Sequence, residues 1–195
     1  RIINWCPHCR TALSDAEVEY KDMPGAFWYI RYPLKDSDDY LTIATTRPET
    51  MLGDTGVAVS PKDPEKAAFV GKTVKLPIVD REIPIFEDWH VDANFGSGFV
   101  KVTPAHDPND YAMGQAHDLP QINIFDEHAV VVEGYGEFTG MTREECREAV
   151  IKWFDEHGLL DHVEEHDHSV MHCYRCDAAL EPWLSEQWFV AVDKL

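Results

Sequence analysis

The sequence predicts an α+β fold, with a mixed or antiparallel, barrel-like sheet core, surrounding helices and a small base formed by the two ends of the chain. Three observations predict it. Short runs rich in β-branched and aromatic residues recur through the middle of the chain, but they do not alternate with helices in a strict βαβ rhythm. One segment has the pattern of an amphipathic helix, and two C-x-x-C pairs lie near opposite ends of the chain.

The composition is that of a folded globular protein. The 195 residues are 44% hydrophobic and 11% aromatic, which suits one core with a small satellite. No apolar run approaches the roughly 20 residues needed to span a bilayer and no signal peptide opens the chain, so we expect no membrane contact. The net charge of −19 argues against a free-standing protein that binds nucleic acid through phosphates.

The first element of the predicted base is a pair of cysteines, Cys6 and Cys9, and the last is a second pair, Cys173 and Cys176. An odd count of five cysteines without a signal peptide argues against a secreted disulfide framework and indicates reduced thiolates in the cytoplasm. Neither pair alone completes a tetrahedral site. We therefore predict one structural zinc site with four thiolate ligands, which requires the two chain ends to meet.

Two alternatives remain open for these cysteines. The pairs could be unrelated and reduced, one of them redox-active, or a neighbouring histidine could replace one thiolate. The candidate histidines are His166, His168 and His172. We place the base at residues 1–24 and 165–195 and the core at residues 25–164. Chain ends that meet suit a domain inserted into a larger protein.

The core elements follow from local patterns. Strands are expected at residues 26–32, 40–45, 56–60 and 98–103, with shorter candidates at 122–125 and 129–132. Helices are expected at 63–70, 108–117 and, most clearly, 143–157. In the last of these, Thr142 and Glu145 form a capping box and Gly158 ends the helix.

The run KVTPAHDPND, from Lys101 to Asp110, crowds polar groups into a strand end, a turn and a helix start. Period-two geometry places Lys101 and Thr103 on one face of the strand. Asp107 before a proline is a helix-capping signal, and Asp110 at the third helical position favours the helix dipole. Either acid could also bind a ligand ammonium. His106 is expected to orient its neighbours rather than act as a general base.

A second polar run, TTRPETMLGDT, lies upstream at residues 45–55. Thr45, Thr46 and Thr50 surround Arg47, ahead of a short helical turn that ends at Gly53. Hydroxyls and free amides beside an arginine suit a phosphate, a ribose or a carbonyl oxygen. The alternative is a solvated loop whose threonines cap the turn. The sequence contains no phosphate-binding loop for ATP, dinucleotide fingerprint, serine nucleophile elbow or H-E-x-x-H helix.

With these residues in view, the chain resembles the editing domain that valyl-tRNA synthetases, members of the class I aminoacyl-tRNA synthetase family, carry within their catalytic domain. The similarity rests on TTRPETMLGDTGVAVSP and FGSGFVKVTPAHDPNDY and continues through GKTVKLPIVDREIPI, HSVMHCYRC and EPWLSEQWFV. It covers essentially the whole chain. Because the ATP-binding motifs are absent, we expect an excised editing insert that cannot make aminoacyl-tRNA.

The resemblance implies a function. Editing domains hydrolyse the ester of a mischarged tRNA, and for the valyl enzyme the wrong amino acid is threonine. A hydrophobic synthetic pocket rejects this isostere of valine by only ~10²-fold, as the general account of this enzyme class holds. The implied activity is therefore a Thr-tRNA(Val) deacylase. The alternatives are a zinc-stabilised interaction module that is inactive when excised, and the editing domain of an isoleucyl or leucyl relative.

The resemblance also implies roles for residues of this chain. Lys101, Thr103 and Asp107 would test the threonine hydroxyl, and Asp110 would hold the α-ammonium. The groups expected at the terminal adenosine and the ester are Arg47, Thr50, Thr45, Thr46, Phe95 (stacked on the adenine ring) and, in a supporting role, His106. A positioned water would attack the ester without a catalytic metal. The expected partners are the 3′ end of tRNA(Val) and the rest of the synthetase in cis, and the isolated domain is expected to be monomeric.

Overall fold

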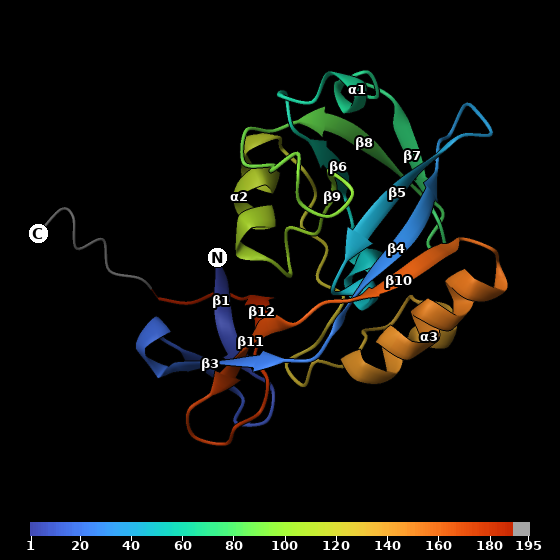
Figure 1. Ribbon diagram of the computed structural model, residues 1–195. Helices are drawn as coiled ribbons and strands as arrows, with labels where there is room; N and C mark the ends of the chain where they lie inside the picture. The colour runs from blue at the N-terminus through green and yellow to red at the C-terminus, as the bar shows by residue number, and fades with distance from the viewer. Residues whose placement is uncertain (189–195) are drawn as a thin grey trace, which may run out of the picture.

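The core of the protein, seen in a computed structural model that describes residues 1–188, is built on two sheets (Figure 1). The first has the strand order β7 (Thr73–Leu76), β8 (Arg81–Glu87), β6 (Gly56–Val59) and β9 (Phe99–Val102). Strands β6 and β8 are parallel and the other pairs are antiparallel, so the sheet is mixed, as predicted. All four residues of β6 are buried, which suits its central place.

The second sheet is antiparallel and has the order β10 (Leu160–Glu165), β4 (Ala26–Pro33) and β5 (Tyr40–Thr45). One hydrophobic cluster fills the space between it and the first sheet, with Ile30 and Ile43 from this sheet and Val57 from β6 fully buried. The isolated bridge between Leu34 and Val74 links the sheets. The predicted barrel-like closure was wrong: within residues 1–188 the sheets stay open, because one bridge rather than a ladder connects them.

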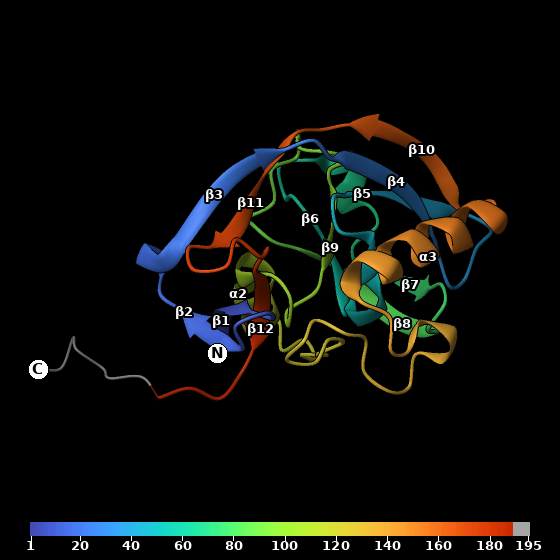
Figure 2. The same cartoon turned by 90° about the horizontal axis from the view of Figure 1, so that it is seen from below.

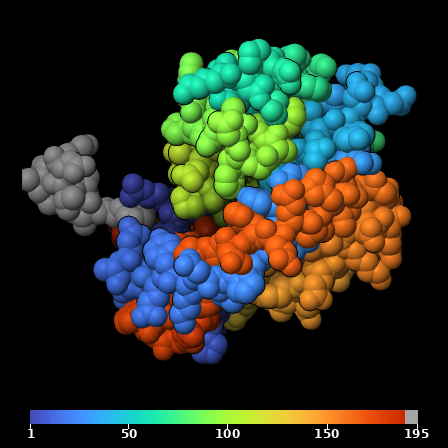
Figure 3. All heavy atoms as spheres, in the orientation of Figure 1, coloured from blue at the N-terminus to red at the C-terminus, as the bar shows by residue number. Residues whose placement is uncertain are grey.

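The two ends of the chain pack together, as Figures 2 and 3 show for the blue and red segments. Strands β1 (Ile2–Cys6), β2 (Thr11–Leu13) and β12 (Glu181–Leu184) form one small sheet, and β3 (Val18–Met23) pairs with β11 (His168–Cys173). A separate hydrophobic cluster that includes Leu13 and Leu180 lies here. Two indole N–H groups tie these strands to the core: Trp5 donates to the Glu127 carbonyl at 2.7 Å, and Trp183 to the Phe125 carbonyl at 3.1 Å. Residues 189–195 of the predicted base lie outside the described residues.

Two helices match their predicted ranges to within one residue, whereas the helix predicted at 63–70 is a single turn that ends at Ala67. The helices are α1 (Pro64–Ala67), α2 (Pro108–Ala116) and α3 (Arg143–Glu156), with 3-10 turns η1 (Asp15–Glu17), η2 (Pro48–Gly53) and η3 (Gly136–Phe138). The predicted capping box opens α3, and Cys146, Val150 and Phe154 at four-residue spacing form its buried stripe. Cys146, the fifth cysteine, which belongs to neither C-x-x-C pair, is thus a core residue. Among residues 1–188, no helix combines the length and apolar character needed to cross a bilayer.

The four main strand predictions are confirmed to within two residues at each end, and the two short ones were wrong. Residues 122–125 and 129–132 make isolated bridges instead, Phe125 to Val131 and Val130 to Thr142. The cause is a tight turn in which Asp126 Oδ1 accepts from the amide of Val130 at 3.0 Å and Ala129 has a φ of 56°. This backbone cannot continue a ladder.

Candidate functional site

The two polar runs singled out in the sequence meet at the side chain of Lys101. Its ammonium donates to Thr50 Oγ1 at 2.7 Å, which comes from η2, and to Thr103 Oγ1 at 2.6 Å, at the end of β9. Gly53 permits this approach, since a Cβ there would lie 3.2 Å from Thr103 Cγ2 and 3.0 Å from Ile124 Cγ2. Lys101 and Thr103 share one face of β9, as period-two geometry predicted.

Asp54 is the centre of this cluster, and sequence reasoning missed it. Its Oδ1 accepts from Thr103 Oγ1 at 2.6 Å and from Lys101 Nζ at 3.1 Å, while its Oδ2 accepts from the Tyr32 hydroxyl at 2.8 Å. Burial raises the pKa of Asp54, and Lys101 and the hydroxyl donors oppose that shift. The available signal was an acid inside the TTRPETMLGDT run that had no assigned task.

Hydrogen-bond directions in the cluster are fixed by its chemistry. The Lys101 ammonium only donates, and its three N–H groups have three acceptors: Thr50, Asp54 and Thr103. Thr103 must therefore donate to Asp54, and Thr50 donates to the Arg47 carbonyl at 3.0 Å. Thr50, Asp54 and Thr103 are fully buried, and Lys101 is the most exposed member at 10% of its side chain. The cluster is closed and internally satisfied.

The turn after β9 holds two acids with different surroundings. Asp107 caps α2 as predicted, its Oδ1 accepting from the amides of Asn109 at 2.7 Å and Asp110 at 3.0 Å. Asp110 is buried, and its Oδ2 accepts from the Thr103 amide at 2.8 Å. Burial, with a contribution from the charge of Asp107, raises the pKa of Asp110 to about 7. A carboxyl group so placed favours a cationic ligand.

Arg47 lies in a buried ionic network instead of an open loop. Its guanidinium donates to Glu181 at 2.8 Å, to Glu49 at 3.0 Å and to the His106 carbonyl at 3.2 Å. Arg147 on α3 binds the other side of Glu49, and Arg143 binds Glu181. Burial opposes ionisation of Glu181, but Arg47, His106 and Arg143 outweigh it and hold its pKa at about 2. No sequence pattern indicated this network.

His106 is buried and lies between two polar neighbours, and its orienting role stays a prediction. Its Nε2 accepts from the amide of Ile124 at 3.0 Å, and its Nδ1 lies 3.3 Å from Glu181 Oε1. Burial lowers the pKa of His106 and so favours the neutral ring.

The remaining predicted site residues lie around η2 and β4. Thr45 Oγ1 accepts from the Arg47 amide at 3.0 Å and so fixes the turn, while Thr46 beside it is half-buried. Phe95, in the loop between β8 and β9, is 55% exposed and packs edge-on against Phe27 at 5.4 Å between ring centroids. The exposed part of the Phe95 ring is available for stacking with another aromatic ring. The substrate contacts of these residues stay predictions.

A concave surface also exists away from the two polar runs. A cavity of about 530 Å³ is lined by Arg81, Tyr135 and Trp153, among others. Arg81 donates to the carbonyls of Leu52 and Asp54 at 3.2 and 2.9 Å. Arg81 thus links the wall of this cavity to run 45–55, but none of the lining residues belongs to runs 45–55 or 101–110.

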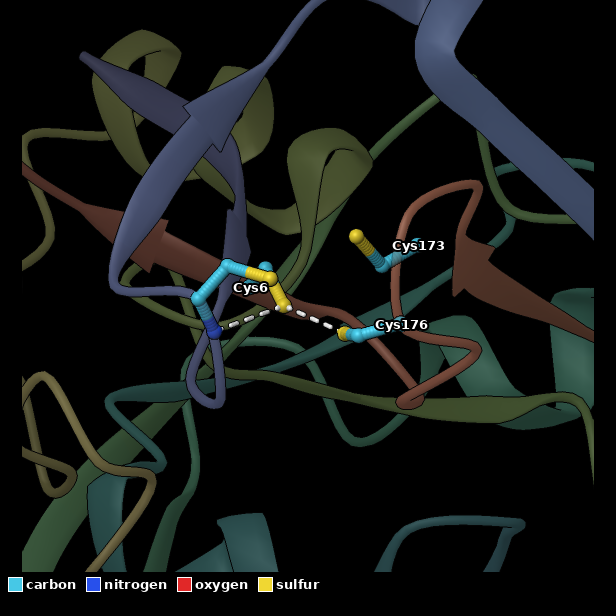
Figure 4. Close-up of side chains that lie close together, drawn as sticks. Cys6, Cys173 and Cys176 are labelled. Carbon is cyan, nitrogen blue, oxygen red and sulfur yellow. Dashed lines mark hydrogen bonds between the residues drawn. The ribbon is translucent and has the colours of Figure 1, made fainter.

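The four cysteines of the two C-x-x-C pairs come together in the base, and Figure 4 shows three of them, Cys6, Cys173 and Cys176. Their sulfur atoms all lie within 4.8 Å of one another, and the sulfurs of Cys6 and Cys176 are 3.5 Å apart. Tetrahedral zinc with Zn–S bonds near 2.3 Å needs sulfurs about 3.8 Å apart, so Cys6, Cys9, Cys173 and Cys176 fit it. Within residues 1–188 the group contains no histidine. A metal bound here would link the two chain ends and play a structural part.

Comparison with known proteins identifies the class to which this fold and site belong. The family model described as tRNA synthetases class I (I, L, M and V) matches residues 1–195, and the chain belongs to this family. Within it, the chain is 56% identical to the valine–tRNA ligase of Thermotoga maritima and 54% identical to that of Fervidobacterium nodosum. Each match covers 100% of this chain and 22% of the relative, so the chain spans about a fifth of the length of these ligases. The resemblance to valyl-tRNA synthetases is confirmed.

Solved structures support the fold. The LeuRS of Agrobacterium radiobacter K84, in a ternary complex with tRNA and LeuAMS, superposes with a TM-score of 0.55 and 20% identity over 86% of this chain and 24% of that one. The crystal structure of GlLeuRS-CP1 gives a TM-score of 0.57 and 16% identity over 72% of this chain and 99% of that one. The second match shows that this architecture occurs as a separate unit.

Proposed function

We propose that this chain hydrolyses the ester of mischarged Thr-tRNA(Val), as the editing part of a valine–tRNA ligase. The observation that carries the proposal is the meeting of runs 45–55 and 101–110 at Lys101, in a chain whose relatives are valine–tRNA ligases and whose fold resembles GlLeuRS-CP1. Two polar segments far apart in sequence converge on one cluster, and Asp110 lies directly beside it.

Discrimination between threonine and valine follows from the closed hydrogen-bond network. Every N–H of Lys101 has an acceptor, so a ligand hydroxyl has to exchange with one contact, and the longest is the 3.1 Å bond to Asp54. A threonine hydroxyl would take the place of Asp54 as acceptor of that Lys101 N–H. A valine methyl displaces it without replacement and leaves buried polar groups unpaired, at a cost of about 1–3 kcal/mol.

Asp110 supplies the second recognition element. Its carboxylate would accept the substrate α-ammonium, since within residues 1–188 its hydrogen-bond donor is the Thr103 amide, and burial and the charge of Asp107 raise its pKa. Asp107 would help to test the hydroxyl while its Oδ1 caps α2. These two acids orient the ester, and Thr50 lies at the ester end of the cluster. A water placed beside the carbonyl then completes the reaction without a nucleophilic side chain.

The terminal adenosine would stack on Phe95, an interaction worth roughly 1–3 kcal/mol per base in single-strand recognition. Thr45, Thr46 and Arg47 would shape the neighbouring backbone. The base, residues 1–24 and 165–195, would connect the core, residues 25–164, to the rest of the ligase. Because the chain carries a net charge of −19, most tRNA affinity would come from other parts of that ligase.

The test is single-turnover deacylation with the chain in excess over Thr-tRNA(Val) or Val-tRNA(Val). Release of threonine with valine largely spared supports the proposal, and equal hydrolysis of both contradicts it. A panel with mischarged tRNA(Ile) and tRNA(Leu) separates the isoleucyl and leucyl alternatives. Complete inactivity of a folded chain at high concentration would favour the inactive interaction module, which the closed Lys101 cluster makes the second candidate.

A further inference from the structure

Glu181 stands where the base meets the proposed site. It opens β12, the strand that follows the second cysteine pair, and it is 1% exposed. Among the described residues, the side chains that bind its carboxylate come from the core. Both carboxylate oxygens accept from Arg47 Nη2 at 2.8 Å, and Oε2 also accepts from Arg143 Nη1 at 3.3 Å. Glu181, a residue of the base, thus forms ion pairs with two arginines of the core.

The same carboxylate reaches both site segments. Arg47 belongs to run 45–55 and precedes the turn that carries Thr50 and Asp54, and His106 belongs to run 101–110, between Thr103 and the helix cap. A shift of Glu181 would therefore move both walls of the Lys101 cluster together. Glu49, the other buried acid of the network, has Arg47 and Arg147 as its side-chain hydrogen-bond donors within residues 1–188, whereas Glu181 also reaches His106.

The chemistry fixes how His106 is held. The Ile124 amide can only donate, so the Nε2 atom that it contacts at 3.0 Å must accept. In the neutral ring the hydrogen then sits on Nδ1, which points at Glu181 Oε1 at 3.3 Å. The imidazole thus contacts the Ile124 amide of the core on one side and the Glu181 carboxylate of the base domain on the other. Its Nδ1–H is a direct reporter of the Glu181 contact.

We propose that Glu181 is a positioning residue for the editing reaction: by holding Arg47 and His106 at once, it sets the distance between the two segments that form the site. This inference rests on the proposed function. Glu181 would touch no reacting atom and would act through Arg47 and His106, which it binds. The base would then be part of the catalytic apparatus as well as an attachment.

The experiment compares Glu181→Gln with the wild-type chain in single-turnover deacylation of Thr-tRNA(Val). We expect the saturating rate to fall about 10²-fold, the loss typical of a misplacement near 1 Å, with the half-saturating concentration within threefold. The NMR signal of His106 Nδ1–H should disappear, and exchange of the Ile124 amide should quicken. Glu181→Asp keeps the charge but is shorter, so it should fold and lose about tenfold in rate.

Two controls separate positioning from stability. Glu19→Gln alters an exposed acid of β3, for which no side-chain contact is described, and should behave as wild type. Val150→Ala leaves a cavity in the buried face of α3 without changing any side chain that binds Glu181, and it should lose stability while keeping its rate. A folded Glu181→Gln or Glu181→Asp chain with a wild-type rate and an intact His106 signal would overturn the inference. Inactivity of the wild type itself would instead refute the proposed function.

Discussion

Two buried carboxylates near the site, Glu181 and Asp110, face opposite surroundings. Glu181 is surrounded by Arg47, Arg143 and His106, and its pKa is about 2 despite burial. Asp110 accepts a hydrogen bond from one backbone amide and lies near another acid, and its pKa is about 7. The partners, and not the depth of burial, decide the charge. Glu181 is paired with arginines and fixes architecture, whereas Asp110 forms no direct ion pair within residues 1–188 and suits a cationic ligand.

Removing the metal that the four cysteines fit should have the largest effect and should separate these two regions. Apparent binding free energies of structural zinc in zinc-finger peptides are about 10–16 kcal/mol, so chelation should release β12 and with it Glu181. The turn that carries Asp110 should stay folded, because its hydrogen bonds join residues close in sequence. Amide exchange is the measurement: Leu180, bonded to the Met171 carbonyl, should exchange quickly, and Tyr111, bonded to the Asp107 carbonyl, should stay protected. Equal exchange at both amides would contradict the separation.

Neutralising Asp110 should remove activity without removing stability. Asp110→Asn should slow Thr-tRNA(Val) deacylation between about 10-fold and 100-fold, the value of a hydrogen bond to a charged group at about 1.4 kcal/mol per tenfold. Thermal unfolding should be unchanged or shifted upward, since the charge is uncompensated in the free protein. Asp118→Asn, at an exposed acid just after α2, is the matched control. A strong loss of stability in Asp110→Asn would contradict this prediction, because it would mean that Asp110 stabilises the fold as Glu181 does.

The two acids should also respond to pH with opposite signs. The pKa of Glu181 is lowered from 4.5 to about 2, so its contribution to stability is present above pH 4.5 and is lost as pH falls toward 2. The pKa of Asp110 is raised from 3.8 to about 7, so its contribution is present below pH 3.8 and is lost as pH rises toward 7. Urea unfolding of wild type and Asp110→Asn should show wild type losing a few kcal/mol relative to the variant between pH 4 and pH 7. A difference that does not change with pH would disprove the shift.

The smallest expected effect is at Asp107. Because its Oδ1 accepts two amides of the first turn of α2, Asp107→Ala should cost about 1 kcal/mol of unfolding free energy. Asp107→Asn preserves the cap and should stay within about 0.5 kcal/mol of wild type. Chemical denaturation of both variants measures this. If Asp107→Asn keeps its stability but discriminates less between threonine and valine, Asp107 also binds the ligand.

Local signals made much of this molecule predictable. The capping box of α3, the Asp107 cap of α2 and the alternation in β9 depend on neighbouring residues, so the sequence was enough to place them. The meeting of the four cysteines was predicted from ligand count. Strands β7 and β8 alternate between buried and exposed residues and could have been found by the same periodicity.

Other features depend on partners distant in sequence. Strand β10 reads LDHVEE, which is mostly polar, and it is a strand because it pairs with β4. Asp54 and Glu181 looked like ordinary acids, and their importance comes from Tyr32, Thr103 and Arg47 reaching them across the fold. The sheets stay open because of how β4 and β7 approach at one bridge, which no local pattern encodes.

The pairing of β1 with β12 sets an order for biosynthesis. Cys6 and Cys176 are 170 residues apart, so a ribosome adding about 5–20 residues per second makes the first pair roughly 10–30 s before the second. During that interval Cys6 and Cys9 lack the two sulfurs of the second pair, while the core strands β4 to β9 are being made. The base is therefore the last part to assemble, and a nascent chain interrupted before Cys173 would contain both polar runs without Glu181 to hold them.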